Sequence, residues 1–333
     1  AAIHGIVEIS RGCGRNCQFC APTMRRRKDI PYDNIINEVK VNVREGRELI
    51  TLATEDCLIY GANTHDGKFQ PNVHAVCELF RKITAVEGVK YVQPAHLSLA
   101  PVAAEPEMIT ELDHILDGYG RFVMRRGNKK FRTIGESGIE TGSSRLIAKY
   151  MRGKPLPYTP EEYPEMVMEA LGILNDNNFM TLSTFMIGLP EETDADVLKS
   201  IELVDEMIYG NYMSFLVPNV FINLHDCILR KERKADFNQL TELQMEMFIN
   251  CWKYNLKNFR AKWLNSNTKG REIVYHGVAR LLFPSVYLLY YRKHHDKFAK
   301  YLKDFFLAAS GYTPINVSRQ FNINQLKAKH RYT

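Results

Sequence analysis

Three cysteines near the start of the chain have the type and spacing to bind an iron–sulfur cluster. Cys13, Cys17 and Cys20 lie in the run Arg11-Gly-Cys-Gly-Arg-Asn-Cys-Gln-Phe-Cys20. A cubane [4Fe–4S] cluster held by three cysteine thiolates keeps one iron without a protein ligand, and that iron can bind a substrate or cofactor. The triplet therefore indicates a catalytic cluster rather than a purely structural one.

A zinc knuckle is the simplest alternative for these cysteines. It needs a fourth ligand, for which His4 is the nearest candidate, but His4 falls inside a predicted strand and no second Cys/His pair follows. The total of seven cysteines is odd and three are clustered, which argues against a disulfide framework and favours a reducing cytoplasm. We interpret the scattered remainder as structural: Cys57, Cys77, Cys227 and Cys251.

The length and composition fit one large folded domain or a domain with an appendage. The chain has 333 residues, of which 45% are hydrophobic and 25% charged, so a sizeable core is available. The longest apolar stretch, residues 278–291, is broken by Arg280 and Pro284 and is too short to span a membrane. No signal peptide is visible, and the missing initial methionine suggests that upstream sequence has been removed.

Strand-like and helix-like segments alternate up to about residue 222. One helical face comprises Ile35, Ile36, Val39 and Val43, with Asp33 as the expected N-cap. The alternation predicts an α/β fold whose strands pair in parallel through right-handed crossovers. The six strand-like runs are Ile3–Ile9, Leu49–Ala53, Val89–Leu99, Phe131–Gly135, Met180–Ile187 and Ser214–Ile222.

Polar and glycine-containing stretches follow the predicted strands. In parallel α/β folds ligands gather at the carboxyl ends of the strands, so these stretches are expected to share one rim. In chain order they are the cysteine triplet, Glu55-Asp56, His96 with Ser98, Glu136 to Ser143, and Gly188-Leu-Pro.

The composition changes near Arg230. From there to the end we count twenty Lys and Arg against seven Asp and Glu, a net charge of +13, which leaves −7 on the preceding part. Half of the aromatic residues also lie beyond Arg230, and helix-like patterns occur there at 240–260 and 284–308. We therefore divide the chain into a core domain, 1–229, and a helical, basic, aromatic-rich C-terminal region, 230–333.

The Cys-x3-Cys-x2-Cys run, with Phe19 before its last cysteine, resembles the signature of radical S-adenosylmethionine (SAM) enzymes. In that family the amino and carboxylate groups of SAM chelate the open iron, and an electron from the cluster cleaves SAM to methionine and a 5′-deoxyadenosyl radical. The resemblance covers roughly residues 5 to 210. It implies a partial (β/α)6 TIM-like barrel, followed here by the mainly helical extension.

Two further motifs extend the resemblance. Leu52-Ala-Thr-Glu-Asp56 takes the place of the family's Gly-Gly-Glu stretch, which binds the SAM amino group; its glycines are replaced, so either Glu55 or Asp56 would take that role. Gly138-Ile-Glu-Thr-Gly-Ser143 resembles the motif after the fourth strand, which implies that Glu140 reaches the SAM ribose, with Ser143 nearby. A helix cap is the alternative role of Glu140.

The next two motifs concern the SAM carboxylate and adenine. The helix ending Lys149-Tyr-Met-Arg-Gly153 resembles the family's continuation, in which a basic residue meets the SAM carboxylate, and Arg152 is the candidate. The stretch 185–193 resembles the motif that places backbone against adenine, which implicates Ile187 and Gly188. Arg152 at a helix C-terminus and Gly188 in a plain turn are the alternatives.

Three residues are candidates for contacting substrate. Arg25 begins the basic run Arg25-Arg-Arg-Lys28, which could offset cluster charge or hold a phosphate, and which could equally be a solvated loop. Tyr60 and His96 lie toward the same predicted rim.

Two branches of the family resemble this chain. Methylthiotransferases, which act on tRNA or protein, share Tyr60-Gly61 but normally carry an upstream domain with three more cysteines and a downstream RNA-binding β-barrel. Cobalamin-dependent enzymes share Arg11-Gly-Cys13, Gly138-Ile-Glu140 and a helical C-terminal region, and carry a cobalamin domain upstream. We expect methyl transfer with cobalamin bound by a missing upstream domain. A hypothesis of another class is a non-catalytic iron–sulfur or zinc scaffold.

The resemblance also implies partners. A ferredoxin or flavodoxin would supply the electron. The basic C-terminal region, residues 287–293 above all, could contact RNA or an anionic membrane surface. Its simplest interpretation is an amphipathic helical cap on the barrel.

Overall fold

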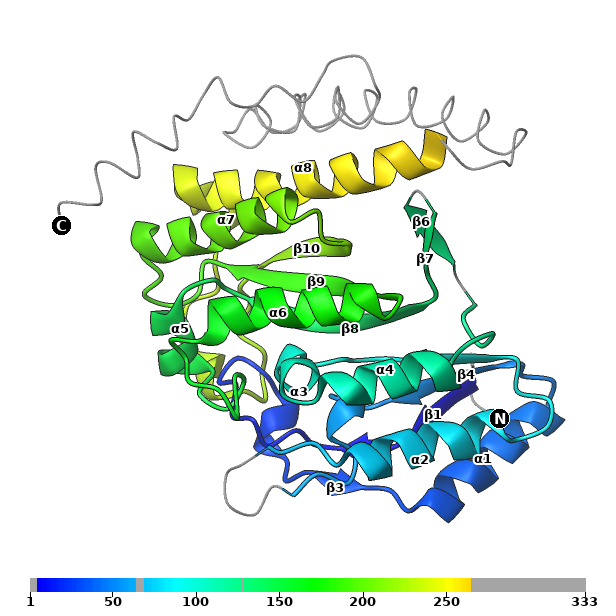
Figure 1. Cartoon of the computed structure of the whole chain (residues 1–333). Coiled ribbons are helices and arrows are strands. Elements are labelled where there is room, and N and C mark those ends of the chain that lie inside the picture. The colour runs from blue at the N-terminus through cyan, green and yellow to red at the C-terminus, as the bar shows by residue number, and fades with distance from the viewer. Residues whose placement is uncertain (1–4, 64–68, 122, 127, 265–333) are drawn as a thin grey trace.

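A computed structural model describes residues 5–63, 69–121, 123–126 and 128–264 (Figure 1). Six parallel strands alternate with helices over this range, and each overlaps a strand predicted from the sequence. These strands are β1 (Ile6–Glu8), β4 (Leu49–Ala53), β5 (Tyr91–Pro94), β8 (Thr133–Glu140), β9 (Phe179–Ile187) and β10 (Ser214–Val220). The helices are α1 (Tyr32–Arg44), α2 (Val73–Thr84), α3 (Leu99–Ala104), α4 (Pro106–Ile115), α5 (Ser144–Tyr150), α6 (Tyr163–Asp176), α7 (Asp194–Tyr209) and α8 (Glu242–Leu264).

The six strands form two parallel three-stranded sheets. The first sheet has the order β1-β4-β5 and the second the order β10-β9-β8. A single parallel bridge between His96 and Glu136 joins them, in which Leu97 N–H donates to the Glu136 carbonyl at 2.8 Å and Glu136 N–H to the Ala95 carbonyl at 2.7 Å. The parallel α/β prediction is confirmed. Closure of the strands into a partial barrel stays a prediction.

Helix starts follow local capping chemistry. Asn72 accepts the Ala75 N–H at 3.0 Å and so begins α2, while Thr193 and Asp196 form a reciprocal capping box at α7. Pro31, rather than the expected Asp33, occupies the N-cap position of α1. Asp33 instead lies in the first turn, where a carboxylate interacts favourably with the helix dipole.

Two antiparallel hairpins accompany the parallel sheets. The strands β2 (Ser10–Arg11) and β3 (Lys28–Asp29) pair at the base of the cysteine loop, and β6 (Met124–Arg126) pairs with β7 (Lys129–Phe131) before β8. Each strand has two or three residues, too few to leave an alternation in the sequence. Four short 3-10 helices complete the described elements: η2 (Pro22–Met24), η3 (Cys57–Ile59), η4 (Ile228–Lys231) and η5 (Phe237–Gln239).

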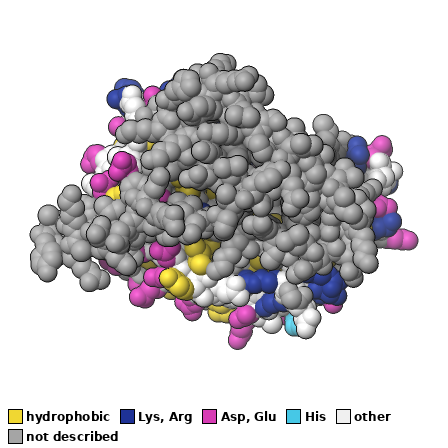
Figure 2. All heavy atoms as spheres, turned by 90° about the horizontal axis from the view of Figure 1, so that it is seen from above, with side chains coloured by type: hydrophobic (Ala, Val, Ile, Leu, Met, Phe, Trp, Pro, Cys, Tyr) yellow, Lys and Arg dark blue, Asp and Glu magenta, His cyan; other side chains and the backbone are white. Residues whose placement is uncertain are grey.

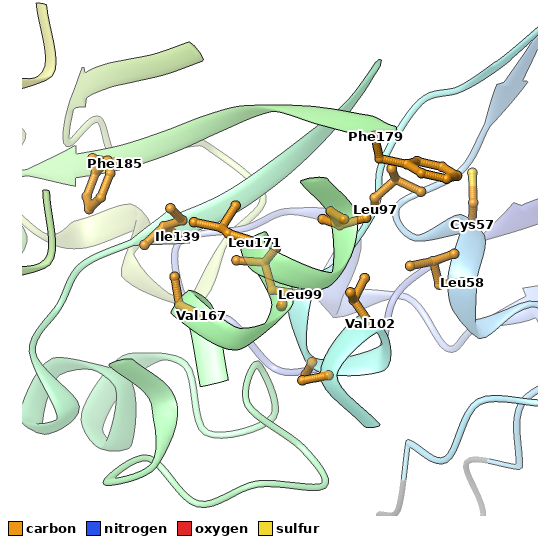
Figure 3. Packing of buried hydrophobic residues seen from close by; sticks show 14 of the residues in the cluster. Cys57, Leu58, Leu97, Leu99, Val102, Ile139, Val167, Leu171, Phe179 and Phe185 are labelled. Carbon is orange, nitrogen blue, oxygen red and sulfur yellow. The ribbon is translucent and has the colours of Figure 1, made fainter. Parts of the chain in front are cut away.

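The main core lies between the sheets and the helices that cover them. Figure 3 shows Leu99 and Val102 of α3 close to Val167 and Leu171 of α6, with Ile139 of β8 beside them. All of these side chains are fully or almost fully buried. The isolated cysteines belong to the same core, since Cys57, Cys77, Cys227 and Cys251 are each at most 2% exposed.

Helix α8 belongs to the C-terminal region that the sequence analysis separates at residue 230. It packs on α7 and β10 (Figure 1), and Asn255 both accepts the Leu216 N–H at 2.7 Å and donates to the Leu216 carbonyl at 2.6 Å. The predicted helix at 284–308 and the basic segment 287–293 lie outside the described residues. Among the helices that are described, none is long and apolar enough to cross a membrane.

Candidate active site

A cavity of about 550 Å3 opens between the two sheets, near the carboxyl ends of β1, β4 and β5. Its walls come from the loops after these three strands, from β8 and β9, and from the loop after α5. Seven of the candidates named from the sequence line it: Cys13, Cys17, Phe19, Cys20, Glu55, His96 and Glu140.

The backbone of the cysteine loop is held in a conformation that glycine favours. Gly12 and Gly14 have φ angles of +79° and +78°, and Asn16 follows at +58°. A Cβ atom at residue 12 would lie 2.7 Å from the carbonyl oxygens of Arg25 and Arg26, so the loop folds back too closely for any side chain there. The β2–β3 pairing closes the base of this loop and presents the three cysteines to the cavity.

Arg15 anchors the cysteine loop to the second half of the fold. Its side chain is 3% exposed, and its guanidinium donates to the carbonyls of Gly153 and Lys154 at 3.2 and 3.0 Å and to the Asp56 carboxylate at 3.4 Å. A Cβ atom on Gly153 would lie 2.1 Å from the Arg15 carbonyl oxygen, so only glycine permits this approach.

The three thiols have the chemistry that a metal cluster requires. All are free, and burial raises the pKa of Cys13, Cys20 and Cys17, in the last case to about 12. Burial thus disfavours the bare thiolates, and bound iron would replace the protons that the thiols otherwise keep. No three His, Cys, Asp or Glu side chains in the described ranges converge on a single metal ion. The donor set thus fits a cluster, in which each cysteine binds a different iron.

Glu140 is the strained acidic residue of the cavity. It ends β8 after a register shift, with φ at +68°, a left-handed conformation that costs a non-glycine residue energy and is found preferentially at functional sites. Its carboxylate lies 3.3 Å from the Lys154 ammonium and accepts the Thr184 hydroxyl at 3.3 Å. Because a Cβ on Gly138 would overlap the Glu140 carboxylate, glycine at 138 leaves room for it.

Lys154 completes a buried ion pair with Glu140, with side chains 16% and 9% exposed respectively. Burial by itself lowers the pKa of Lys154, but Glu140 together with the nearby Tyr163 and Cys17 offsets this and raises it above its usual value. The ammonium thus stays charged within the cavity.

The structure separates the two acidic residues that follow β4. Asp56 is fully buried away from the cavity, where its carboxylate accepts the N–H groups of Leu58 and Ser98 and meets Arg15. Glu55 lines the cavity, and its Oε2 atom is buried without a hydrogen-bond partner in the described part of the chain. A buried carboxylate oxygen without a donor is costly, so a cationic ligand group placed there would be stabilised.

His96 faces the cavity together with Glu136 of β8. Its Nδ1 lies 2.9 Å from the Thr54 carbonyl oxygen and its Nε2 lies 3.1 Å from Glu136 Oε2. The two side chains are 46% and 57% exposed, so both remain accessible to a bound molecule.

Like Asp56, the predicted residues Ser143, Arg152 and Tyr60 lie outside this cavity. Ser143 caps α5 by accepting the Leu146 N–H and donates to Asp196 at 2.5 Å. Arg152 is on the surface, where its Nε donates to the Ala148 carbonyl at 3.1 Å. Tyr60 is 5% exposed and its hydroxyl donates to the Ile30 carbonyl at 2.6 Å, while burial raises its pKa to about 12.

The remaining candidates lie near the cavity without lining it. Ile187 is buried at the end of β9, and Gly188 has φ at +80° and donates its N–H to Glu192 at 2.8 Å. Arg25 lines a second cavity of about 630 Å3, which shares Pro22 and Glu55 with the first.

Sequence reasoning missed two residues that the structure brings to this site, Arg15 and Lys154, and it placed Glu136 on the rim without pairing it with His96. Arg15 lies inside the cysteine motif, and Lys154 directly follows the helix motif in which Arg152 was chosen. Lys154 could therefore have been found by considering every basic residue near the end of that motif, since it lies two positions after Arg152. Nothing in the sequence pairs Glu136 with His96, since forty residues separate them.

Comparison with known proteins follows the same motifs. No protein-family model matches the sequence. A tRNA-2-methylthio-N(6)-dimethylallyladenosine synthase of Geobacter sulfurreducens is 26% identical over 247 residues, which cover 72% of this chain and 49% of that protein. The enzyme of the same name from Ralstonia nicotianae is 24% identical over 226 residues, covering 66% and 44%. With the cysteine motif and the parallel sheets, this similarity supports membership of the radical SAM superfamily.

The chain spans about half the length of the curated relatives it matches. Among solved structures, the radical SAM methyltransferase TsrM from Kitasatospora setae, with cobalamin and a [4Fe–4S] cluster bound, is 12% identical with a TM-score of 0.46 over 68% of this chain and 38% of that one. HydG, a maturase of the [FeFe]-hydrogenase, has 11% identity and a TM-score of 0.43, covering 98% and 81%. These structural likenesses are too weak to add to the assignment.

Proposed function

We propose that the chain is the catalytic core of a radical SAM transferase. The cavity that brings Cys13, Cys17 and Cys20 together with Glu55 and Glu140 supports this function most directly. When bound, a [4Fe–4S] cluster supplies the electron that cleaves SAM and so provides a 5′-deoxyadenosyl radical for hydrogen abstraction from a substrate.

The chain's own residues would hold and orient SAM. We assign the SAM ammonium to Glu55, because its buried Oε2 atom has no other donor in the described ranges. We assign the ribose to Glu140 and the SAM carboxylate to Lys154, the cation that lies beside Glu140 in the cavity. Phe19 would cover the cluster, while Arg15 and Asp56 keep the loop in place without touching the ligand.

The proposal also concerns which chemical group the enzyme transfers. We place methyl transfer with cobalamin first, because the described residues after β10 form the 23-residue helix α8 and no strand of a small RNA-binding barrel. Methylthio transfer is the second candidate, favoured by the similarity to the two synthases. The sequence encoded immediately upstream separates them: three further cysteines would favour methylthio transfer, and a cobalamin-binding domain methyl transfer. We propose a ferredoxin or flavodoxin as the electron donor.

Anaerobic reconstitution tests the central claim. The protein is loaded with iron and sulfide, reduced with dithionite and incubated with SAM, and 5′-deoxyadenosine is measured by mass spectrometry. The expected result is 5′-deoxyadenosine that disappears in C13A, C17A and C20A but persists in C77A, whose thiol is buried in α2 away from the cavity. Bound zinc or iron without any 5′-deoxyadenosine would instead indicate a non-catalytic scaffold.

A further inference from the structure

The β6–β7 hairpin concentrates positive charge in a segment that the radical chemistry does not use. Residues 121–132 read Arg-Phe-Val-Met-Arg-Arg-Gly-Asn-Lys-Lys-Phe-Arg, which contains six Lys and Arg and no Asp or Glu. The connection from α4 to β8 occupies residues 116–132, whereas a helix-to-strand connection of about 2–6 residues is typical. Long connections of this kind are frequently functional.

Strand pairing places these cations opposite one another. Arg125 pairs with Lys130 and Arg126 with Lys129, so both cross-strand pairs carry like charges. Like charges directly opposite each other destabilise a hairpin. The hairpin is nevertheless fixed, because Phe131 is 2% exposed and packs with Met180, Met213 and Met124.

Most cations near the hairpin have partners within the chain. Arg132 forms ion pairs with Asp113 and Asp117, Lys129 lies 3.6 Å from Asp176, and Arg126 donates to the Asn211 carbonyl. The exceptions are Arg125 and Lys130. Both are exposed, and neither has an ion pair or side-chain hydrogen bond with the described residues. The anchored face of the hairpin thus leaves an Arg–Lys pair available to an external anion.

The position of the hairpin excludes it from the reaction itself. It precedes β8, whereas Glu140 of the cavity ends that strand eight residues later, a span of about 26 Å. In Figure 1, β6 and β7 extend away from the two sheets at the upper right. Figure 2 shows Lys and Arg side chains at the lower right of the visible face.

The chemistry of the outer face favours a nucleic-acid backbone over a protein or a membrane. Protein interfaces are depleted of charge at their centre, and membrane-surface elements present a broad apolar face. Among the described residues of the segment 121–132 itself, Val123 is the one exposed large apolar side chain. A narrow two-stranded ribbon carrying Arg and Lys matches the shape and charge with which β-ribbons approach nucleic acids.

We propose that the β6–β7 hairpin is a docking surface for an RNA phosphate backbone, with Arg125 and Lys130 each contacting one phosphate. The phosphates would relieve the repulsion between the two cations. This surface does not depend on the proposed SAM chemistry, since it shares no residue with the cavity.

Fluorescence anisotropy with a labelled RNA stem-loop tests the proposal on the intact chain across a series of salt concentrations. We expect micromolar binding by the wild type. Each phosphate contact contributes about 0.7–0.9 to the slope of log affinity against log salt, so R125Q/K130Q should lower the slope by about 1.4–1.8. At 0.1 M salt the same relation gives an affinity loss of about 25- to 60-fold.

A matched control removes the same two charges elsewhere. Lys40 and Arg44 are exposed on α1, so K40Q/R44Q makes an identical change in net charge and should alter the slope by less than half a unit. Equal losses in both variants would mean that net charge alone drives binding, and would overturn the proposal. So would absence of RNA binding by the wild type, including the case in which anionic phospholipid vesicles bind instead through Arg125 and Lys130.

Discussion

Replacing Asp56 and Glu55 one at a time separates a folding role from a ligand-binding role in adjacent residues. In D56N the two backbone N–H groups keep an acceptor at the position of Oδ1, but an amide replaces the carboxylate that faces Arg15. In E55Q the altered group is the Oε2 atom that lies buried at the cavity without a donor among the described residues.

D56N is expected to lower the stability of the fold, whereas E55Q is expected to weaken SAM binding. The side chains of Asp56 and Arg15 are 1% and 4% exposed, so they form a buried pair. Breaking a buried pair lowers the free energy of unfolding by about 3–5 kcal/mol. Because the two groups are 3.4 Å apart, the loss in D56N should lie near ~3 kcal/mol. E55Q should change the free energy of unfolding by less than about 0.5 kcal/mol. It should weaken SAM binding by about 10- to 150-fold, since a hydrogen bond to a charged group contributes about 1.5–3 kcal/mol.

Two measurements follow these effects. Urea unfolding of the metal-free protein should show the D56N midpoint lowered by about 1 M, at a denaturant slope of about 3 kcal/mol/M. Calorimetric titration of SAM into the anaerobically reconstituted protein should show the loss of affinity in E55Q. The reasoning is wrong if E55Q unfolds the protein, or if D56N retains wild-type stability and loses SAM affinity instead.

Three further predictions concern other residues around the cavity. K154M should lower the rate of 5′-deoxyadenosine formation by about 10- to 150-fold, because it removes the charged partner of Glu140. In R152M, altered on the surface, the rate should stay within about twofold of the wild type. Chromatographic product analysis measures both rates. G153A should lower the free energy of unfolding by about 1–3 kcal/mol, because the added Cβ overlaps the Arg15 backbone. Gly172 of α6 is the control, since a Cβ there would lie no closer than 3.6 Å to any neighbour, so G172A should leave the free energy of unfolding unchanged or raise it by up to about 1 kcal/mol. Urea titrations measure both variants. Burial raises the pKa of Glu192 from 4.5 to about 7. Between these two values the folded protein binds a proton that the unfolded chain releases. The free energy of unfolding should therefore fall by about 3 kcal/mol as the pH rises from 4.5 to above 7. E192Q should lack this contribution, and identical pH profiles for E192Q and the wild type would show that Glu192 does not titrate in that range.

Much of the fold followed from the sequence because long, regularly alternating segments leave clear patterns. The strand predicted at Leu49–Ala53 is β4, and the predicted helical face of Ile35, Ile36, Val39 and Val43 belongs to α1. The pattern gives less information about boundaries. The fourth strand was expected to end at Gly135 but continues to Glu140, because the polar residues along it line the cavity and so interrupt the apolar pattern.

The site was predictable where one short segment carries the chemistry. The cysteine triplet lies in eight residues, and all three thiols line the cavity. Contacts between distant segments were not predictable. The choice between Glu55 and Asp56 depends on Arg15, which reaches Asp56 and the backbone after α5 in three dimensions, and His96 meets Glu136 only because β5 and β8 are neighbours.

The single bridge between His96 and Glu136 has a consequence for the order in which the protein assembles. Each three-stranded sheet is built from one half of the described chain, so each can form without contacts to the other half. The cysteines and Glu55 belong to the first sheet's loops, whereas Glu140 and Lys154 belong to the second half. The cavity therefore comes into existence only when the two halves dock. A cluster that is inserted before docking would meet its cysteine ligands without the enclosing wall, so cluster loading is expected to be the last step of maturation.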